Sequence, residues 1–204
     1  MLEVSVVVIG VAITLSASYW ISNRSQKRDT TLYLSTIKLE LEENKNMLDS
    51  TVRRLQPSVR YANYLRAHDK KSLDADTIRF YNEAYGEANT LIIKTNAFDM
   101  FKTSGNMRFV DKDLLLMIWD TYAKLDNLKQ GYDGLIQMKM DEIQRTAQLF
   151  SLYDFASMPD EEILKNIPMY QFYAHISAPY IMPQMCEVYS QTISETLIKL
   201  EQAK

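Results

Sequence analysis

The stretch VSVVVIGVAITLSASYWISN, Val4 to Asn23, contains no charged residue. A helix of this length is about 30 Å long at 1.5 Å per residue, which matches the hydrocarbon layer of a bilayer. Tyr19 and Trp20 stand near its end, where amphipathic rings favour the headgroup level. We therefore predict a transmembrane anchor with its basic flank at 1–28 and an all-α soluble domain at 29–204.

A cleaved signal peptide is the alternative interpretation of this stretch. Such peptides begin with a basic region, whereas only Met1, Leu2 and Glu3 precede the apolar run here. Ser16-Ala17-Ser18 is also a poor match to a cleavage site. The pattern favours an uncleaved, single-pass anchor in contact with the lipid bilayer.

The charges beside the anchor predict its orientation. Arg24, Lys27 and Arg28 follow the apolar run, and no lysine or arginine precedes it. Because basic residues are enriched on the cytoplasmic side of membrane helices, this pattern places the soluble domain in the cytoplasm.

Small residues recur every four positions along the anchor, and such a face lets two membrane helices approach closely. The pattern predicts packing against a second copy or another membrane protein, although small residues are also common in membrane helices generally. The positions are Gly10, Thr14, Ser18 and Ser22.

The segment Asp29–Gln56 reads as a juxtamembrane helix that continues out of the anchor. It carries leucines seven residues apart, at 34, 41, 48 and 55. Lysines at 38 and 45 occupy the companion positions of the heptad and argue against a long parallel coiled coil. We expect the leucines to face the chain's own domain.

Helix signals continue through the next part of the chain. Pro57 is predicted to open a second helix, because a proline costs little in a first turn. Ser72 or Asp74 caps a helix to about Tyr85, and a short helix from about Asn96 to Thr103 stops at Ser104-Gly105.

The C-terminal part is also helical in pattern. Asp111 opens the longest soluble helix, whose apolar period continues to Phe150. Acidic residues after Pro159 suit another first turn, and a final helix starts at about Pro183. No segment shows strand-like alternation, so we predict an all-α helical bundle.

Composition excludes some classes of function. The chain has 23 basic and 26 acidic residues, which gives no basic excess of the kind that nucleic-acid binders show. Its single cysteine, Cys186, allows no intrachain disulfide.

Residues that could carry chemistry are sparse. Cys186 and His175 are the pair closest to a nucleophile and base, but a buried structural thiol is the stronger interpretation. His68 has no neighbour at zinc-site spacing. Asp154, Asp160, Glu161 and Glu162 lack a calcium-loop pattern, so helix capping explains them better. We predict no catalytic, cofactor or metal site and no enzymatic activity.

The segment Asn166–Cys186 contains no Asp, Glu, Lys or Arg and is rich in aromatic residues. Packing in the core explains this uncharged, aromatic composition best. A surface for a partner or ligand is the second interpretation, and contact with the bilayer is the third. The candidate partner or ligand residues are Tyr170, Phe172, Tyr173, His175 and Tyr180.

Two motifs carry a family resemblance. One is EVSVVVIGVAI at Glu3–Ile13, followed by Trp20, Asn23 and a basic run; the other is AFDMFKTSG at Ala97–Gly105, followed by the stretch from Leu114 to Tyr122. Both resemble a family of Gram-negative bacterial single-pass membrane proteins catalogued as a domain of unknown function.

The resemblance implies a protein of the bacterial inner membrane and brings no activity or functional residue. Its members usually begin with a basic stretch before the membrane helix, which implies a periplasmic domain, whereas the charges of this chain favour the cytoplasm.

Together these patterns predict a membrane-anchored helical interaction, scaffold or accessory protein without catalysis. The alternative is a ligand-sensing bundle in which the juxtamembrane helix transmits a change to the anchor.

Overall fold

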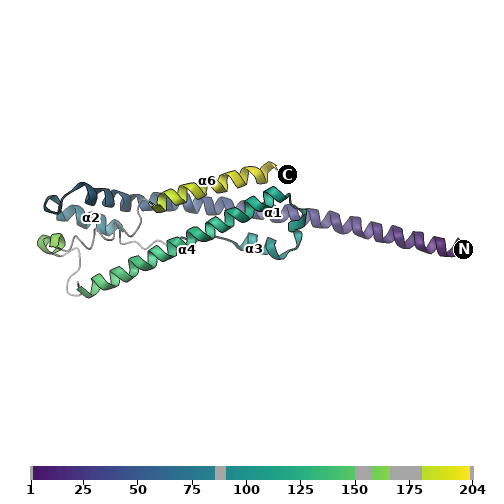
Figure 1. Ribbon diagram of the computed structural model, residues 1–204, viewed down its shortest axis with the longest axis horizontal. Helices are drawn as coiled ribbons and strands as arrows, with labels where there is room; N and C mark the ends of the chain where they lie inside the picture. The colour runs from purple at the N-terminus through teal and green to yellow at the C-terminus, as the bar shows by residue number, and fades with distance from the viewer. Residues whose placement is uncertain (1, 86–90, 150–157, 166–180, 203–204) are drawn as a thin grey trace. The chain divides into compact units, whose positions relative to one another are not determined.

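The computed structural model describes residues 2–85, 91–149, 158–165 and 181–202, and every regular element in them is a helix (Figure 1). Within these ranges, the side chains of residues 2–12, 70, 82–85, 138–140, 142–149 and 181 lie outside the description. None of the described residues belongs to a β-strand, which confirms the all-α prediction. The elements are α1 (Leu2–Ala67), η1 (Lys70–Ser72), α2 (Ala75–Tyr85), α3 (Asn96–Thr103), η2 (Asn106–Phe109), α4 (Lys112–Leu149), a short helix at 160–165, and α6 (Ile181–Gln202).

Helix α1 is continuous through Pro57, so the prediction that this proline opens a second helix is wrong. A proline inside a helix removes one backbone hydrogen bond and crowds the preceding turn. Packing outweighs that cost here, because Leu48 and Thr51 before the proline and Tyr61 and Ala62 after it are all buried.

The predicted leucine stripe of α1 does face the protein interior. Leu41 and Leu48 are fully buried, and Leu34 and Leu55 are half-buried. The single chain therefore covers this stripe itself, as expected for domain packing rather than for a parallel dimer.

Local signals set the ends of α2, α3 and α4 as predicted. The Asp74 carboxylate accepts a hydrogen bond from the Thr77 backbone N–H at 2.7 Å and caps α2. The Asp111 carboxylate does the same for α4, accepting from the N–H groups of Asp113 and Leu114 at 3.0 and 3.1 Å. Helix α3 ends before Gly105, whose φ of 71° lies in the left-handed region that glycine adopts readily.

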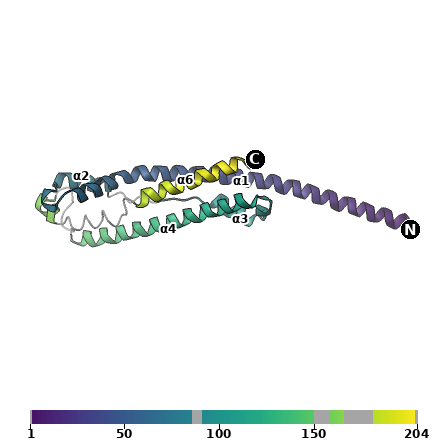
Figure 2. The same cartoon turned by 45° about the horizontal axis from the view of Figure 1, so that its top comes forward.

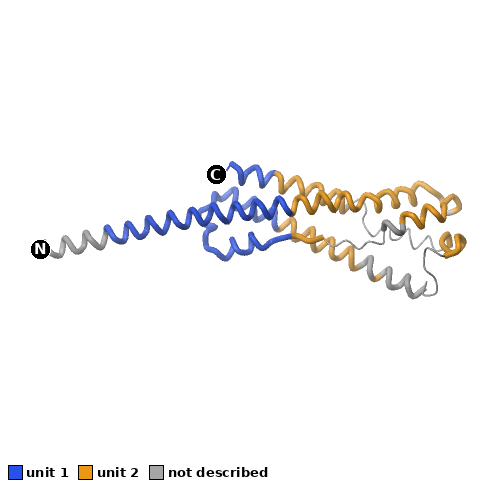
Figure 3. Tube along the Cα trace, turned by 180° about the vertical axis from the view of Figure 1, so that it is seen from behind, with its two compact units in different colours: residues 1–43, 94–122, 195–204 blue, residues 44–93, 123–194 orange. Residues whose placement is uncertain are grey.

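The chain divides into two compact units, drawn in blue and orange in Figure 3. Unit 1 contains residues 1–43, 94–122 and 195–204, and unit 2 contains residues 44–93 and 123–194. Helices α1, α4 and α6 each contribute residues to both units.

The core of unit 1 combines aliphatic and aromatic side chains from four helices. Its buried members include Ile37, Leu41, Phe101, Ile118 and Leu200. A buried hydroxyl pair, Thr121 with Thr196 at 2.8 Å, joins α4 to α6.

The core of unit 2 contains a cluster in which α2 packs on the C-terminal part of α1, as Figure 2 shows, together with residues 158–164. Its fully or nearly fully buried members are Tyr61, Ala62, Leu65, Leu73, Ala75, Ile78, Met158 and Ile163. At a separate point of unit 2, Ser190 of α6 donates a hydrogen bond to Asp49 of α1 at 2.7 Å.

The side chains that the structure describes begin at Ile13. Within them no helix is both long and apolar enough to cross a bilayer.

Candidate functional site

The N-terminal part of α1 leaves large apolar side chains uncovered. Each described residue from Ile13 to Ser22 is exposed. The largest apolar side chains among them are 61 to 74% exposed: Ile13, Leu15, Tyr19, Trp20 and Ile21. A monomeric soluble protein rarely exposes a continuous apolar patch of this kind, so this segment is the first candidate for a contact with another phase or molecule.

The predicted packing face of this segment is only partly described. Thr14, Ser18 and Ser22 are exposed on α1, whereas the side chain of Gly10 lies outside the described residues. The proposed contact through this face therefore stays a prediction.

A second candidate is the buried carboxylate of Glu40, which joins α1, α3 and α4 within unit 1. Its oxygens accept hydrogen bonds from the Ala97 and Phe98 backbone N–H groups at 2.8 and 3.4 Å and from the Tyr122 hydroxyl at 2.6 Å. The N-terminus of a helix favours a negative charge, so a residue of α1 here supplies the cap of α3.

The residues that bind this carboxylate also carry aromatic rings that pack on one another. Phe98 stacks on Tyr122 with ring centroids 4.2 Å apart and meets the edge of Trp119 at 5.3 Å. The Lys102 ammonium lies 4.8 Å from the centroid of the Phe98 ring. Burial, and then the neighbouring Glu40, raise the pKa of Tyr122 above its usual range, so its hydroxyl stays protonated and acts as a hydrogen-bond donor.

Sequence reasoning did not single out Glu40. A signal was nevertheless present, because Glu40 lies on the same helical face as Ile37, Leu41 and Leu48, all fully buried. A charged residue within an apolar stripe indicates a buried partner, and the partners here lie 57 to 82 residues away in the chain.

Unit 1 also contains an open cavity of about 320 Å³. It is lined by Asp111, Asp113, Leu114, Met117, Lys199 and Gln202. Asp113 lies in the first turn of α4, and Asp111 directly precedes that helix and already caps it with its carboxylate.

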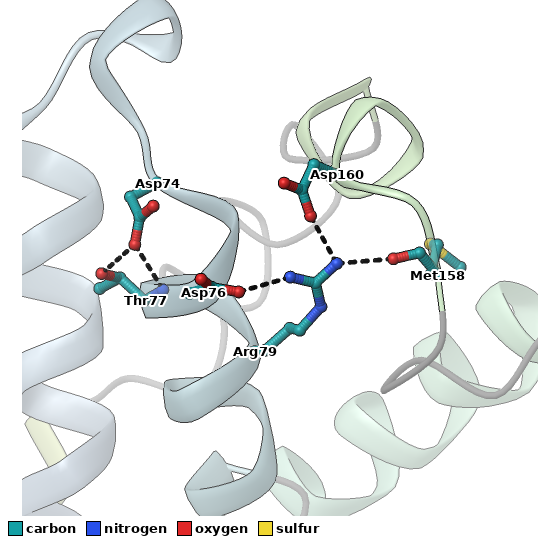
Figure 4. A network of polar contacts seen from close by, with 6 residues as sticks. All are labelled: Asp74, Asp76, Thr77, Arg79, Met158 and Asp160. Atoms are coloured by element: carbon teal, nitrogen blue, oxygen red, sulfur yellow. Dashed lines mark hydrogen bonds and ion pairs between the residues drawn. The ribbon is translucent and has the colours of Figure 1, made fainter.

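In unit 2, the Arg79 guanidinium is the centre of a polar network that ties α2 to the segment at 158–160 (Figure 4). It donates to Asp76 at 2.6 Å, to Asp160 at 2.6 Å and to the Met158 carbonyl at 2.7 Å. The hydrogen bonds to Asp160 and Asp76 raise the pKa of Arg79, which stays charged. Asp160, part of the acidic cluster of the sequence, thus makes a structural ion pair.

The other residues that could carry chemistry, where the structure describes them, have contacts that explain them as structural residues. Cys186 is fully buried, as the structural interpretation predicted, and burial raises its pKa to about 11. The exposed His68 ring lies 2.8 Å from the Tyr64 carbonyl. Within the described residues, no group of His, Cys, Asp or Glu side chains could hold a metal ion.

The predicted partner or ligand surface lies outside the described residues. It comprised Tyr170, Phe172, Tyr173, His175 and Tyr180, all within 166–180. The ligand-sensing alternative depends on these residues and stays a prediction.

No protein-family model, curated protein or solved structure matches this chain.

Proposed function

We propose that this protein is a single-pass membrane protein whose helical domain acts by binding partners, as a scaffold or accessory protein without catalysis of its own. The exposed apolar segment of α1 carries the proposal. Its large apolar side chains between Ile13 and Ile21 are exposed, as lipid-facing side chains would be, and the same helix continues without a break into the packed part of unit 1.

The partner-binding part of the proposal is supported by the outer face of α4 in unit 1. Leu116 and Trp119 are 57% and 43% exposed and lie three residues apart, on neighbouring positions of one helical face. Exposed aromatic and aliphatic side chains of this kind are enriched in the centres of protein interfaces.

Crosslinking in native membranes tests this function. We expect the protein to be recovered with a defined partner, and Leu116→Asp to reduce that recovery. Leu39→Asp is the matched control, since Leu39 is a similarly exposed leucine of α1 at 61%. Recovery of a lone monomer from native membranes would contradict the proposal.

The side of the membrane follows from charge. Arg24, Lys27 and Arg28 directly follow the apolar segment, so we propose that the helical domain lies in the cytoplasm, at the inner membrane that the family resemblance implies. A compartment-sensitive reporter fused after Lys204 should be active only in the cytoplasm. Activity only outside would reverse the orientation and leave the anchor in place.

A further inference from the structure

The turn η2 is held against α1 just beyond the proposed membrane segment. Arg108 of η2 donates a hydrogen bond to the Gln26 side-chain oxygen at 3.0 Å, across 82 residues of sequence. Both residues belong to unit 1. The position of η2 along α1 is therefore fixed near residue 26.

This position lies close to the end of the proposed membrane segment. The uncharged segment ends at Asn23, and Gln26 follows three residues later, or about 4.5 Å along a helix. The headgroup region on each side of the hydrocarbon layer is about 5–7 Å thick. If α1 spans the membrane up to Asn23, Arg108 lies at the level of the lipid phosphates.

Cations at this end of unit 1 have no acidic partner within the described part of the chain. They are Arg24, Lys27, Arg28, Arg108 and Lys112, all exposed. Farther along the same unit, Lys38, Lys94 and Lys102 are each paired with a carboxylate.

The acidic groups at this end do not cancel these charges. Asp111 is committed to the cap of α4, and Asp113 shares its cavity with Lys199. Asp29 is the remaining acid of the adjoining turn of α1. Cations remain in excess over acids.

The turn η2 also combines apolar and cationic side chains, a combination that suits a membrane interface. Phe109 and Val110 are half-buried, and the Arg108 guanidinium lies 4.7 Å from the centroid of the Phe109 ring. An aromatic ring beside a cation can rest at the hydrocarbon boundary while the charge meets phosphate.

We propose that η2 and the first residue of α4, together with the basic flank of α1, form a docking surface for the phosphate groups of anionic bilayer lipids. The surface consists of Arg24, Lys27, Arg28, Arg108 and Lys112. This proposal rests on the proposed membrane anchor. The anchor would tether the protein, and the docking surface would in addition hold the helical part of unit 1 against the membrane. Cations close to an anionic lipid surface are attracted to it.

Depth-dependent fluorescence quenching in vesicles tests the surface. The full chain, in a Cys186→Ala background, carries an environment-sensitive label at Val110→Cys, Ile21→Cys or Asn96→Cys. Asn96 is the negative control: it precedes Ala97, which contacts Glu40, about 25 Å along α1 from Asn23. Vesicles contain phosphatidylcholine alone or mixed with phosphatidylglycerol, with a quencher at headgroup depth.

We expect lipid quenching at positions 21 and 110 but not at 96, and stronger quenching at 110 when phosphatidylglycerol is present. Arg108→Glu should reduce quenching at 110 about twofold in the anionic vesicles, and Arg108→Lys should preserve it. Lys94→Glu is the matched charge reversal, because Lys94 pairs with Glu43 away from this surface, and it should leave quenching at 110 unchanged.

Each failure has its own signature. Quenching at 21 without quenching at 110 overturns the docking surface and leaves the anchor intact. Equal quenching at 110 in both kinds of vesicle overturns the preference for anionic lipid. An absence of quenching at 21 overturns the anchor itself, and with it the proposed function.

Discussion

At the scale of single residues, one buried carboxylate joins three helices of unit 1. Glu40 provides acceptors for two backbone N–H groups of α3 and for the Tyr122 hydroxyl, all in a site with little access to water. Removing the acceptor of a buried donor destabilises the fold by more than the net free energy of one hydrogen bond. The donor is then shielded from water and has no acceptor in the protein.

We therefore expect Glu40→Ala to lower the free energy of unfolding by about 2–4 kcal/mol, which corresponds to a fall in melting temperature of roughly 5–10 °C. Glu43→Ala is the control on the same helix. Glu43 is paired with Lys94 at 2.8 Å but exposed, so its loss should cost less than about 0.5 kcal/mol. Circular dichroism of the full chain in detergent measures both. Equal shifts would show that the Glu40 contacts do not stabilise unit 1.

Cys186 offers a second test at this scale. Its side chain is fully buried, and burial raises its pKa to about 11, so the thiolate is scarce at pH 8. We expect a thiol reagent to modify the native chain at least about a hundredfold more slowly than the chain unfolded in urea. Comparable rates in the two states would contradict the burial of this residue.

Whether a contact of a single residue can be predicted from the sequence depends on how far apart the two partners lie along the chain. The caps at Asp74 and Asp111 and the stop at Gly105 were predictable, because each acts on a neighbour within three residues. The partners of Glu40, and the contacts of Arg79 with Met158 and Asp160, were not predictable, since they lie 57 to 82 residues away and no local pattern connects them.

At the scale of elements, packing overrides local propensity where the two disagree. Pro57 predicts a helix start by its own chemistry, yet α1 passes through it because buried residues on both sides hold the helix together. The leucine stripe was correctly assigned to the interior, since two lysines made a coiled-coil seam unfavourable.

The cap of α2 makes a pH-dependent contribution to stability. Hydrogen bonds from the Thr77 hydroxyl and backbone N–H hold the pKa of Asp74 below its usual range. A carboxyl whose pKa is lower in the folded state stabilises that state above its unfolded pKa of about 4 and loses the contribution as pH falls further.

We expect the melting temperature of the wild type to fall more between about pH 5 and pH 3 than that of Asp74→Asn. Asparagine is also a good N-cap, so the variant should remain folded at neutral pH while losing the titration. Parallel melting curves against pH for the two proteins would show that Asp74 does not contribute. Asp76→Asn controls for the loss of one nearby carboxylate.

At the scale of the whole molecule, the fold class and the functional proposal rest on different observations. The all-α class follows from helical periodicity and few glycines and prolines, which are properties of the sequence alone. The division into two units does not, because α1, α4 and α6 run through both and no composition change marks residue 43 or 122. The predicted boundary at residue 28 stays a prediction, and α1 crosses that position without a break.

Alkaline extraction of membranes tests most directly whether the exposed apolar segment of α1 resides in a bilayer. The full chain should stay in the membrane pellet. Ile13→Arg with Leu15→Arg should release it, because each charge costs about 2.5–3.5 kcal/mol near the centre of a membrane helix. Leu32→Arg with Leu39→Arg changes equally exposed leucines beyond the segment and should leave the protein in the pellet. Release of the unmodified chain, or retention of the Ile13/Leu15 variant, would contradict the anchor.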